Sequence, residues 1–240
     1  MAVYDTALRR REAVADGTMA FYFDKPAGFT HQAGQNAVFT LLDARESDSQ
    51  GSSRTFSIAS AAHEPGIMVA TRMRDTAFKR SLKSAAPGAK LRIDGPNGVM
   101  VLHEDAARPA AFLAGGIGVT PFLSMARHAA HDRLPHRITL FYANRRAEDA
   151  AFLDELRALE QSNPNFRLVA TMSQADKSAQ AWSGETGFIR ADMLRRHLGD
   201  LKAPVFYCAG PNAMTMSMEM MLADLGVRED DMRSEEFYGY

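Results

Sequence analysis

The residues best suited to chemistry form the stretch GGIGVTPF, which begins at Gly115 and could receive a phosphate group. Gly115, Gly116 and Gly118 carry no side chain that would keep a pyrophosphate from the backbone. Thr120 and Pro121 are typical of an N-cap and a first helical residue. The free N–H groups and the dipole of such a helix favour an anion. The stretch predicts a phosphate-binding turn; the alternative is an ordinary tight turn between buried elements.

A second loop of this kind, AGPNAM, begins at Ala209 and places Gly210 and Pro211 between an apolar run and a helical stretch. In an open parallel sheet, ligands bind beyond the carboxyl ends of the strands, where the loops lead into helices. We therefore expect both loops to face one ligand.

The second half of the chain must position these loops, and its pattern predicts how. Beyond Arg108, apolar runs of strand length alternate with helical stretches. Strands are predicted at residues 110–114, 138–142, 166–170 and 205–208, and helices at 122–130, 149–159, 191–198 and 214–225. This alternation predicts a doubly wound α/β domain, in which helices cover both faces of a parallel sheet.

The first half has a different rhythm, with short strands broken by glycine and proline. Strands are predicted at residues 19–23, 38–42, 55–59, 67–73 and 90–93, with one short helix at 77–84. Closely spaced strands of this kind favour an antiparallel β-barrel. We therefore expect a two-domain chain, with a β-barrel over residues 1–105 and the α/β domain over 106–240.

Charge and hydropathy exclude several classes of function. The net charge is −1 and no lysine or arginine tract is present, so nucleic acid binding is not expected. No apolar run reaches the roughly 20 residues of a membrane span, and the N-terminus lacks the apolar core of a signal peptide. A cytoplasmic protein that does not bind membranes is predicted.

Metal chemistry within the chain is not predicted either. The single cysteine, Cys208, excludes a four-cysteine zinc or iron–sulfur site in this chain. The seven histidines show no ligand spacing supported by carboxylates, and we interpret them as surface or hydrogen-bonded residues. They are His31, His63, His103, His128, His131, His136 and His197.

Three motifs in order, RTFSIAS at residues 54–60, GGIGVTPF at 115–122 and FYCAGPNAM at 206–214, resemble those of the ferredoxin–NADP reductase family of flavoproteins. The GQ pair that begins at Gly34 and the GPNG turn that begins at Gly95 extend the likeness over nearly the whole chain. The resemblance implies that the barrel holds FAD and that the second domain holds NADPH or NADH. Hydride would then pass between the two rings at the cleft between the domains.

In the barrel, the resemblance implies that Arg54 neutralises the FAD pyrophosphate and that the Ser57 hydroxyl lies near flavin N5. A guanidinium offers several hydrogen bonds to phosphate, and a small hydroxyl can bond N5 without blocking the nicotinamide. Phe56 stands where the family usually has tyrosine, so stacking on the flavin could persist. Thr55 and Thr71 complete the strand residues expected at FAD. The alternative is a plain strand with a solvated arginine and a packed phenylalanine.

The short helix that follows is expected to close on the flavin phosphates. Thr76 could cap it and leave the N–H groups of Ala77 and Phe78 for an anion. Five cations in this region form a local basic cluster, which either steers an acidic electron-carrier protein or is a solvated helix face. They are Arg72, Arg74, Lys79, Arg80 and Lys83.

In the second domain, the resemblance assigns the coenzyme pyrophosphate to the glycine loop with Thr120 and Pro121, and the nicotinamide to Gly210 and Pro211. Ala209 stands where many relatives have cysteine, and Cys208, one place earlier, is expected to be a buried strand residue.

The 2′-position of the coenzyme is expected near five residues: Asn144, Arg145, Arg146, Ser173 and Gln174. No carboxylate ends the YANRR stretch, which disfavours strict NAD use, yet Gln174 stands where NADP-specific relatives often have arginine. Both coenzymes therefore remain open.

The chain ends in EEFYGY, where relatives often bring a carboxylate or an aromatic ring to the flavin. Glu236 is the predicted carboxylate, and Tyr238 or Tyr240 could cover the ring. The alternative is a tail that simply packs on the sheet.

The predicted function is an FAD-dependent NAD(P)H oxidoreductase, in which hydride moves from nicotinamide to flavin N5. Because no iron–sulfur domain is present, the acceptor must be separate: a ferredoxin, a flavodoxin or an oxygenase component. The alternatives are a free-flavin or ferric reductase and a non-catalytic nucleotide-binding module.

Overall fold

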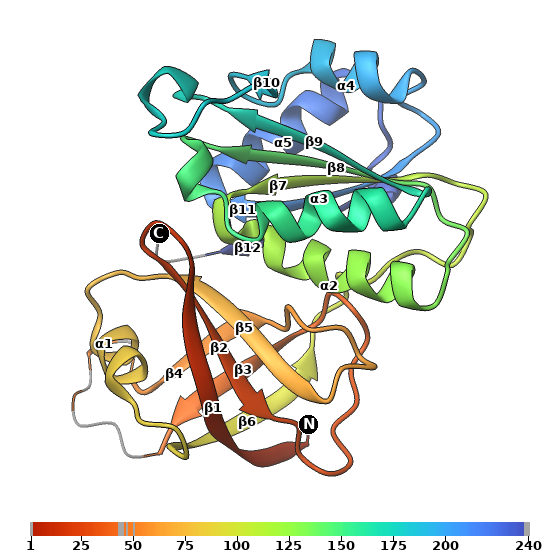
Figure 1. The fold of residues 1–240 in the computed structure, drawn as a ribbon. Coiled ribbons are helices and arrows are strands. Elements are labelled where there is room, and N and C mark those ends of the chain that lie inside the picture. The colour runs from red at the N-terminus through yellow and green to blue at the C-terminus, as the bar shows by residue number, and fades with distance from the viewer. Residues whose placement is uncertain (1, 43–45, 47, 50, 238–240) are drawn as a thin grey trace.

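The computed structural model describes residues 2–42, 46, 48–49 and 51–237. In this part of the chain, two six-stranded sheets form two lobes, with the first half of the chain in one lobe and the second half in the other (Figure 1). No helix in this part is long and apolar enough to cross a lipid bilayer.

The first sheet is antiparallel, with the strand order β4-β3-β6-β1-β2-β5. Its elements are β1 (Val3–Ala15), β2 (Thr18–Asp24), β3 (Asn36–Leu41), β4 (Ser53–Ser57), β5 (Gly66–Arg72), α1 (Ala77–Ser84) and β6 (Lys90–Asn97). The outer strands β4 and β5 meet just beyond the end of β4, where the N–H of Ala59 donates to the carbonyl of Met68 at 2.8 Å. This contact curls the sheet into a barrel, so the predicted antiparallel barrel is confirmed.

Strand β1 was not predicted, because its middle is a run of charged residues without period-2 alternation. Residues 9–13 of this strand are all exposed, and its inward-facing side chains are few. The strand is held by its neighbours: its first part pairs with β6 and its second part with β2.

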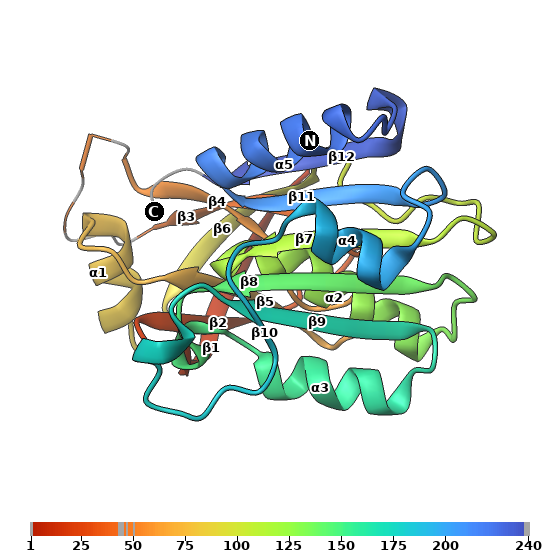
Figure 2. The ribbon, with the colours of Figure 1, turned by 90° about the horizontal axis from the view of Figure 1, so that it is seen from above.

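The second sheet is parallel throughout, with the strand order β10-β9-β8-β7-β11-β12. Its strands are β7 (Ala110–Gly115), β8 (Ile138–Asn144), β9 (Phe166–Met172), β10 (Glu185–Thr186), β11 (Val205–Pro211) and β12 (Met232–Phe237), and its α-helices are α2 (Val119–His131), α3 (Leu153–Ser162), α4 (Ala191–Leu198) and α5 (Asn212–Asp224). Helices α2 and α3 cover one face and α4 and α5 the other (Figure 2). The predicted doubly wound domain is confirmed. The edge strands β10 and β12 were not predicted, since one is very short and the other is polar.

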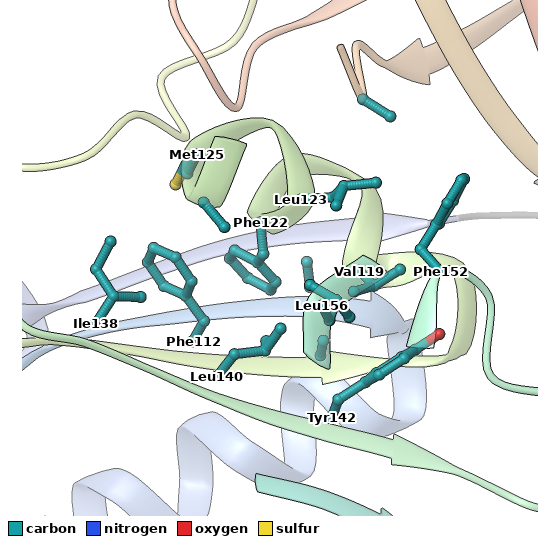
Figure 3. Packing of buried hydrophobic residues seen from close by; sticks show 14 of the residues in the cluster. Phe112, Val119, Phe122, Leu123, Met125, Ile138, Leu140, Tyr142, Phe152 and Leu156 are labelled. Carbon is teal, nitrogen blue, oxygen red and sulfur yellow. The ribbon is translucent and has the colours of Figure 1, made fainter. Parts of the chain in front are cut away.

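Along the buried strands, successive side chains point to opposite faces of this sheet. Phe112 and Ala114 point toward α2 and α3, whereas Ala111 and Leu113 point toward α4 and α5. On the first face, the rings of Phe112 and Phe122 stack with their centroids 4.7 Å apart (Figure 3). Because both faces are covered, the strands read as continuous apolar runs in the sequence.

Helix α2 is buried on two sides, by the sheet and by the barrel. Residues 119–126 are all buried. Toward the barrel, the Ser124 hydroxyl donates to the carbonyl of Ser60 at 2.8 Å. A Cβ added to Gly34 of the barrel would lie only 2.3 Å from Cε of Met125. One apolar core therefore runs from the barrel through α2 into the parallel sheet.

We expect Met125→Ala to lower the free energy of unfolding by about 2–5 kcal/mol, because a cavity would open where α2 meets the barrel. The matched control is Met220→Ala on α5. The Met220 side chain is 67% exposed, whereas Met125 is 1% exposed, so the control should change stability by about 0.5 kcal/mol or less. Urea unfolding of both variants measures the difference, and equal losses would contradict the buried junction.

Candidate active site at the junction of the domains

A cleft of about 340 Å³ lies at the carboxyl ends of strands β7, β8, β9 and β11. This is the place where an open parallel sheet binds its ligands. The cleft brings together six of the residues predicted from the sequence: Gly115, Gly116, Asn144, Arg145, Ser173 and Pro211.

The glycines of the first loop serve two different purposes. A Cβ at Gly118 would lie 2.2 Å from the carbonyl oxygen of Ala209, and a Cβ at Gly115 would lie 2.2 Å from Sδ of Met214. A side chain at either position would clash with the other loop, so these two glycines let the two loops pack against each other, and Gly115 also lines the cleft. Gly116, with φ +53° and nothing within 4 Å of a built Cβ, is the open glycine of the loop. That this loop receives a phosphate remains a prediction.

The loop that follows β11 also needs a glycine where it packs against the first loop. Gly210 has φ +156°, and a Cβ there would lie 3.2 Å from the backbone of Gly115. Ala209 is fully buried beneath the loop, whereas Pro211 lines the cleft. The two loops therefore face one ligand site because they are in direct contact.

The expected N-cap at Thr120 is wrong. Helix α2 begins at Val119, its N-cap is Gly118, and a short 3-10 turn precedes it. Thr120 is buried in the first helical turn, and its hydroxyl donates back to the carbonyl of Ile117 at 3.0 Å. Pro121 is also in the first turn, where its missing N–H leaves no hydrogen bond unmade. The helix therefore begins one residue before Thr120, at Val119.

The cleft residues that were not assigned to the coenzyme from the sequence include Arg72, Arg74, Asp149 and Phe188. Arg72 and Arg74 come from the barrel, at and just after the end of β5, so the cleft is built by both domains. Asp149 follows β8, is 6% exposed and pairs with Arg146 at 2.8 Å. Hydrogen bonds from the Arg146 guanidinium lower the pKa of the Asp149 carboxyl. A carboxylate therefore reaches the cleft from five residues beyond Asn144.

Asn144 indicates that the cleft fits a polar ligand. Its side chain is 8% exposed, and within the described residues no acceptor takes a hydrogen bond from Nδ2. A buried amide without a partner costs about 1–3 kcal/mol, which a ligand acceptor would offset. With the open backbone of Gly116 and the nearby guanidinium groups, the cleft suits an anionic dinucleotide.

On the barrel side, cations converge on the first turn of α1. The Arg54 guanidinium lies over the Phe78 ring, with 5.3 Å to the centroid, and pairs with Asp48 at 2.8 Å. The half-buried ammonium of Lys79 donates to the carbonyl of Arg72 at 2.9 Å. Its burial, together with the Arg74 and Arg54 guanidinium groups, lowers the pKa of Lys79 to about 8. An anion at this place would be favoured, as the phosphates of FAD require.

The predicted cap of α1 is confirmed, because Thr76 is the N-cap and its Oγ1 accepts the N–H of Lys79 at 3.3 Å. Both Ala77 and Phe78 are buried in the first turn. Thr71 is buried on β5 and donates to the carbonyl of Arg72 at 3.3 Å.

Within the RTFSIAS strand, Thr55 is exposed and Phe56 is 9% exposed. The Phe56 ring packs on Phe39 and Phe78, each 5.9 Å away between centroids, in the core of the barrel. Its stacking on a flavin remains a prediction. Two of the five clustered cations, Arg72 and Arg74, instead line the cleft at the ends of the parallel strands, while Arg80 pairs with Glu46 and Asp75.

A carboxylate of β12 reaches from the α/β domain to the barrel. Glu235 of β12 accepts hydrogen bonds from Nδ2 of Asn36 at 2.6 Å and from the hydroxyl of Ser57 at 3.3 Å. Burial raises the pKa of the Glu235 carboxyl, against the effect of these two bonds. Glu236, the carboxylate named from the sequence, is the next residue on the strand and so points to the opposite face. The structure thus brings Glu235, and not Glu236, to Ser57; Tyr238 and Tyr240 lie outside the described residues.

Cys208 is a buried strand residue, as expected, with 1% of its surface exposed. Burial raises the pKa of its thiol to about 12, so it stays protonated at neutral pH. Its side chain lies in the core toward α4 and α5, away from the cleft.

Comparison with known proteins identifies the relatives of this chain. Residues 112–219 match the family model of the oxidoreductase NAD-binding domain. Ferredoxin–NADP reductase B of Sorangium cellulosum is 32% identical over 192 residues, which cover 77% of this chain and 78% of that protein. The glycine betaine monooxygenase reductase subunit of Chromohalobacter salexigens is 26% identical over 92% of this chain, which spans 60% of that relative's length.

Among solved structures, a ferredoxin–NADP⁺ reductase from Neisseria gonorrhoeae with bound FAD and NADP has the same fold. Its TM-score is 0.76 at 19% identity, and the match covers 98% of both chains. The barrel, the doubly wound domain and the sequence likeness to the Sorangium reductase lead to one conclusion: the chain belongs to the ferredoxin–NADP reductase family of flavoprotein reductases.

Proposed function

We propose that this chain is an FAD-dependent reductase that takes electrons from NADPH or NADH and delivers them to a separate acceptor. When bound, FAD supplies the chemistry, because its N5 accepts hydride from the nicotinamide and the ring then releases electrons singly or in pairs. The relatives named as a ferredoxin–NADP reductase and as a monooxygenase reductase subunit support an acceptor of the ferredoxin, flavodoxin or oxygenase-component type.

The observation that carries the proposal is the hydrogen-bonded group of Asn36, Ser57 and Glu235. Two of its members come from the barrel and one from the α/β domain. Ser57 is 3% exposed, so its hydroxyl is held in a place largely closed to water. In this proposal Ser57 orients the reacting edge of the flavin, and Glu235 accepts the hydrogen bond of the Ser57 hydroxyl and holds that hydroxyl in place.

The remaining residues bind and orient the cofactors. Arg54, Lys79 and the first turn of α1 would hold the phosphates of FAD. Asn144 and Arg145 would hold the coenzyme from the α/β domain, with Arg72 and Arg74 reaching it from the barrel. Such positioning would lower the activation barrier of hydride transfer, because binding already holds the nicotinamide and flavin rings in the correct relative orientation.

The proposal is tested by anaerobic titration of the FAD-loaded protein with NADPH and with NADH. We expect at least one coenzyme to bleach the flavin absorbance with one equivalent per flavin. If FAD stays bound and neither coenzyme reduces it, the chain is a non-catalytic nucleotide-binding module. If FAD separates from the protein on gel filtration and is reduced only as a free substrate, a free-flavin or ferric reductase replaces the proposal.

We expect Ser57→Ala and Glu235→Gln each to slow flavin reduction by about 10- to 1000-fold, because each removes one partner from the junction. Anaerobic stopped-flow absorbance measures the rate. Glu236→Gln is the comparison on the neighbouring residue, and its effect should be the smaller one. A larger loss in Glu236→Gln than in Glu235→Gln would return the role to Glu236, and an unchanged rate in Ser57→Ala would remove Ser57.

FAD affinity should fall as pH rises above about 8. In the protein without FAD, Lys79 has a pKa of about 8, and a bound phosphate would raise it. Below that pH, Lys79 is charged with or without FAD; above it, binding must first take up a proton, which weakens affinity by up to about tenfold per pH unit. Fluorescence titration of the FAD-free protein between pH 7 and 9.5 measures this slope. Lys79→Met should flatten it, and the same slope in that variant would exclude Lys79 from the phosphate site.

A further inference from the structure

A cluster of metal-ligating side chains lies at the opposite end of α2 from the cleft. His63 belongs to a turn of the barrel that follows β4, whereas His131 and Asp132 belong to the end of α2. One ligand atom from each of the three lies within 4.8 Å of the others. The imidazole rings of His63 and His131 lie face to face, 3.6 Å apart between centroids and 10° from parallel. The sequence hides this cluster because its histidines are 68 positions apart.

The turn that carries His63 is fixed against α2. Within the turn, the N–H of Ala61 donates to the carboxylate of Glu64 at 2.6 Å. Arg127 of α2 reaches the same carboxylate at 3.3 Å and pairs with Glu155 of α3 at 2.6 Å. Lys25 also donates to the carbonyl of Ala62 at 2.5 Å. His63 is therefore held beside His131 by contacts that do not involve either imidazole.

The helix end suits a cation. His131 is the last residue of α2 and Asp132 is its C-cap, where the helix dipole favours positive charge. The Asp132 carboxylate meets Nδ1 of His131 at 2.5 Å and Nδ1 of His128 at 3.3 Å. His128 thus stands behind the carboxylate and orients it, as residues beside metal ligands commonly do.

We propose that His63, His131 and Asp132 form a binding site for a divalent transition metal ion such as Zn²⁺, which clamps the barrel to the α/β domain. Two imidazoles and one carboxylate are ligands that suit zinc, and water would complete a four-coordinate shell. Coordination requires the two rings to turn out of their stack, since each nitrogen lone pair lies in its own ring plane. All three side chains are exposed, so this rotation meets no packed neighbour.

The site is distinct from the coenzyme cleft. Helix α2 has 13 residues and is therefore about 20 Å long, with the glycine loop at its N-terminus and the cluster at its C-terminus. A metal bound here would act on the contact between the two domains without touching either cofactor.

The test is calorimetric titration of the FAD-loaded, tag-free protein with ZnCl₂ in a buffer that does not chelate metal. We expect one Zn²⁺ per chain and a rise in Tm on binding. His63→Ala and His131→Ala should each abolish both effects, and His128→Ala should weaken Kd about tenfold. His197→Ala is the matched control, because His197 also pairs with a carboxylate, that of Glu185 at 2.8 Å, but within one domain. It should leave Kd unchanged.

Three results would overturn the proposal. The first is no saturable binding of Zn²⁺. The second is binding that persists unchanged in His63→Ala, which would place the metal on α2 alone. The third is an equal loss of Zn²⁺ binding in His197→Ala and in the two ligand variants. That result would mean that binding does not depend specifically on His63 and His131, and that the metal is adventitious only. Flavin content and circular dichroism of each variant confirm that a lost Zn²⁺ signal comes from the ligand and not from unfolding.

Discussion

The structure depends on the burial of helix α2 between the parallel sheet and the barrel. An ordinary covering helix has one apolar stripe and one wet face, whereas residues 119–126 are buried all round. Ser124 and Arg127 add hydrogen bonds to barrel carbonyls along the same helix. The helix that begins at the glycine loop of the cleft is thus also the helix that joins the parallel sheet to the barrel.

Much of the fold could be predicted from the sequence. The spacing of apolar residues indicates which faces are buried, and glycine and proline mark where strands and helices end. The apolar runs of β7, β8, β9 and β11 are unambiguous, since both faces of that sheet are covered. Edge strands gave a weaker signal. Strand β1 carries a run of exposed charges, and β12 reads MRSEEF, which is polar on most positions. These strands form because a neighbour supplies the hydrogen-bonding ladder, and a single sequence does not reveal that neighbour.

The part of the site that lies within the α/β domain was predictable, and the part that needs both domains was not. Asn144, Arg145 and Ser173 were expected from the resemblance to the reductase family, and the cleft contains them. Arg72 and Arg74 enter the same cleft from the barrel, which only the docking of the domains can reveal. The same limit hid Glu235, because its choice over Glu236 depends on the pairing of β12 with β11. The glycine loop shows a different limit. The sequence pattern marks Gly118 as a phosphate-binding glycine, whereas in the structure a glycine is needed there because the Ala209 backbone leaves no room for a Cβ.

Within the described residues, strand β12 pairs only with β11, which aligns Glu235 with Ala209 and Glu236 with Gly210. Because side chains alternate across a strand, a slip of one residue in this single ladder would exchange the inward and outward carboxylates. In one direction of such a slip, Glu236 would take the inner place that Glu235 vacates. The register of this ladder therefore decides which of two adjacent carboxylates faces the junction.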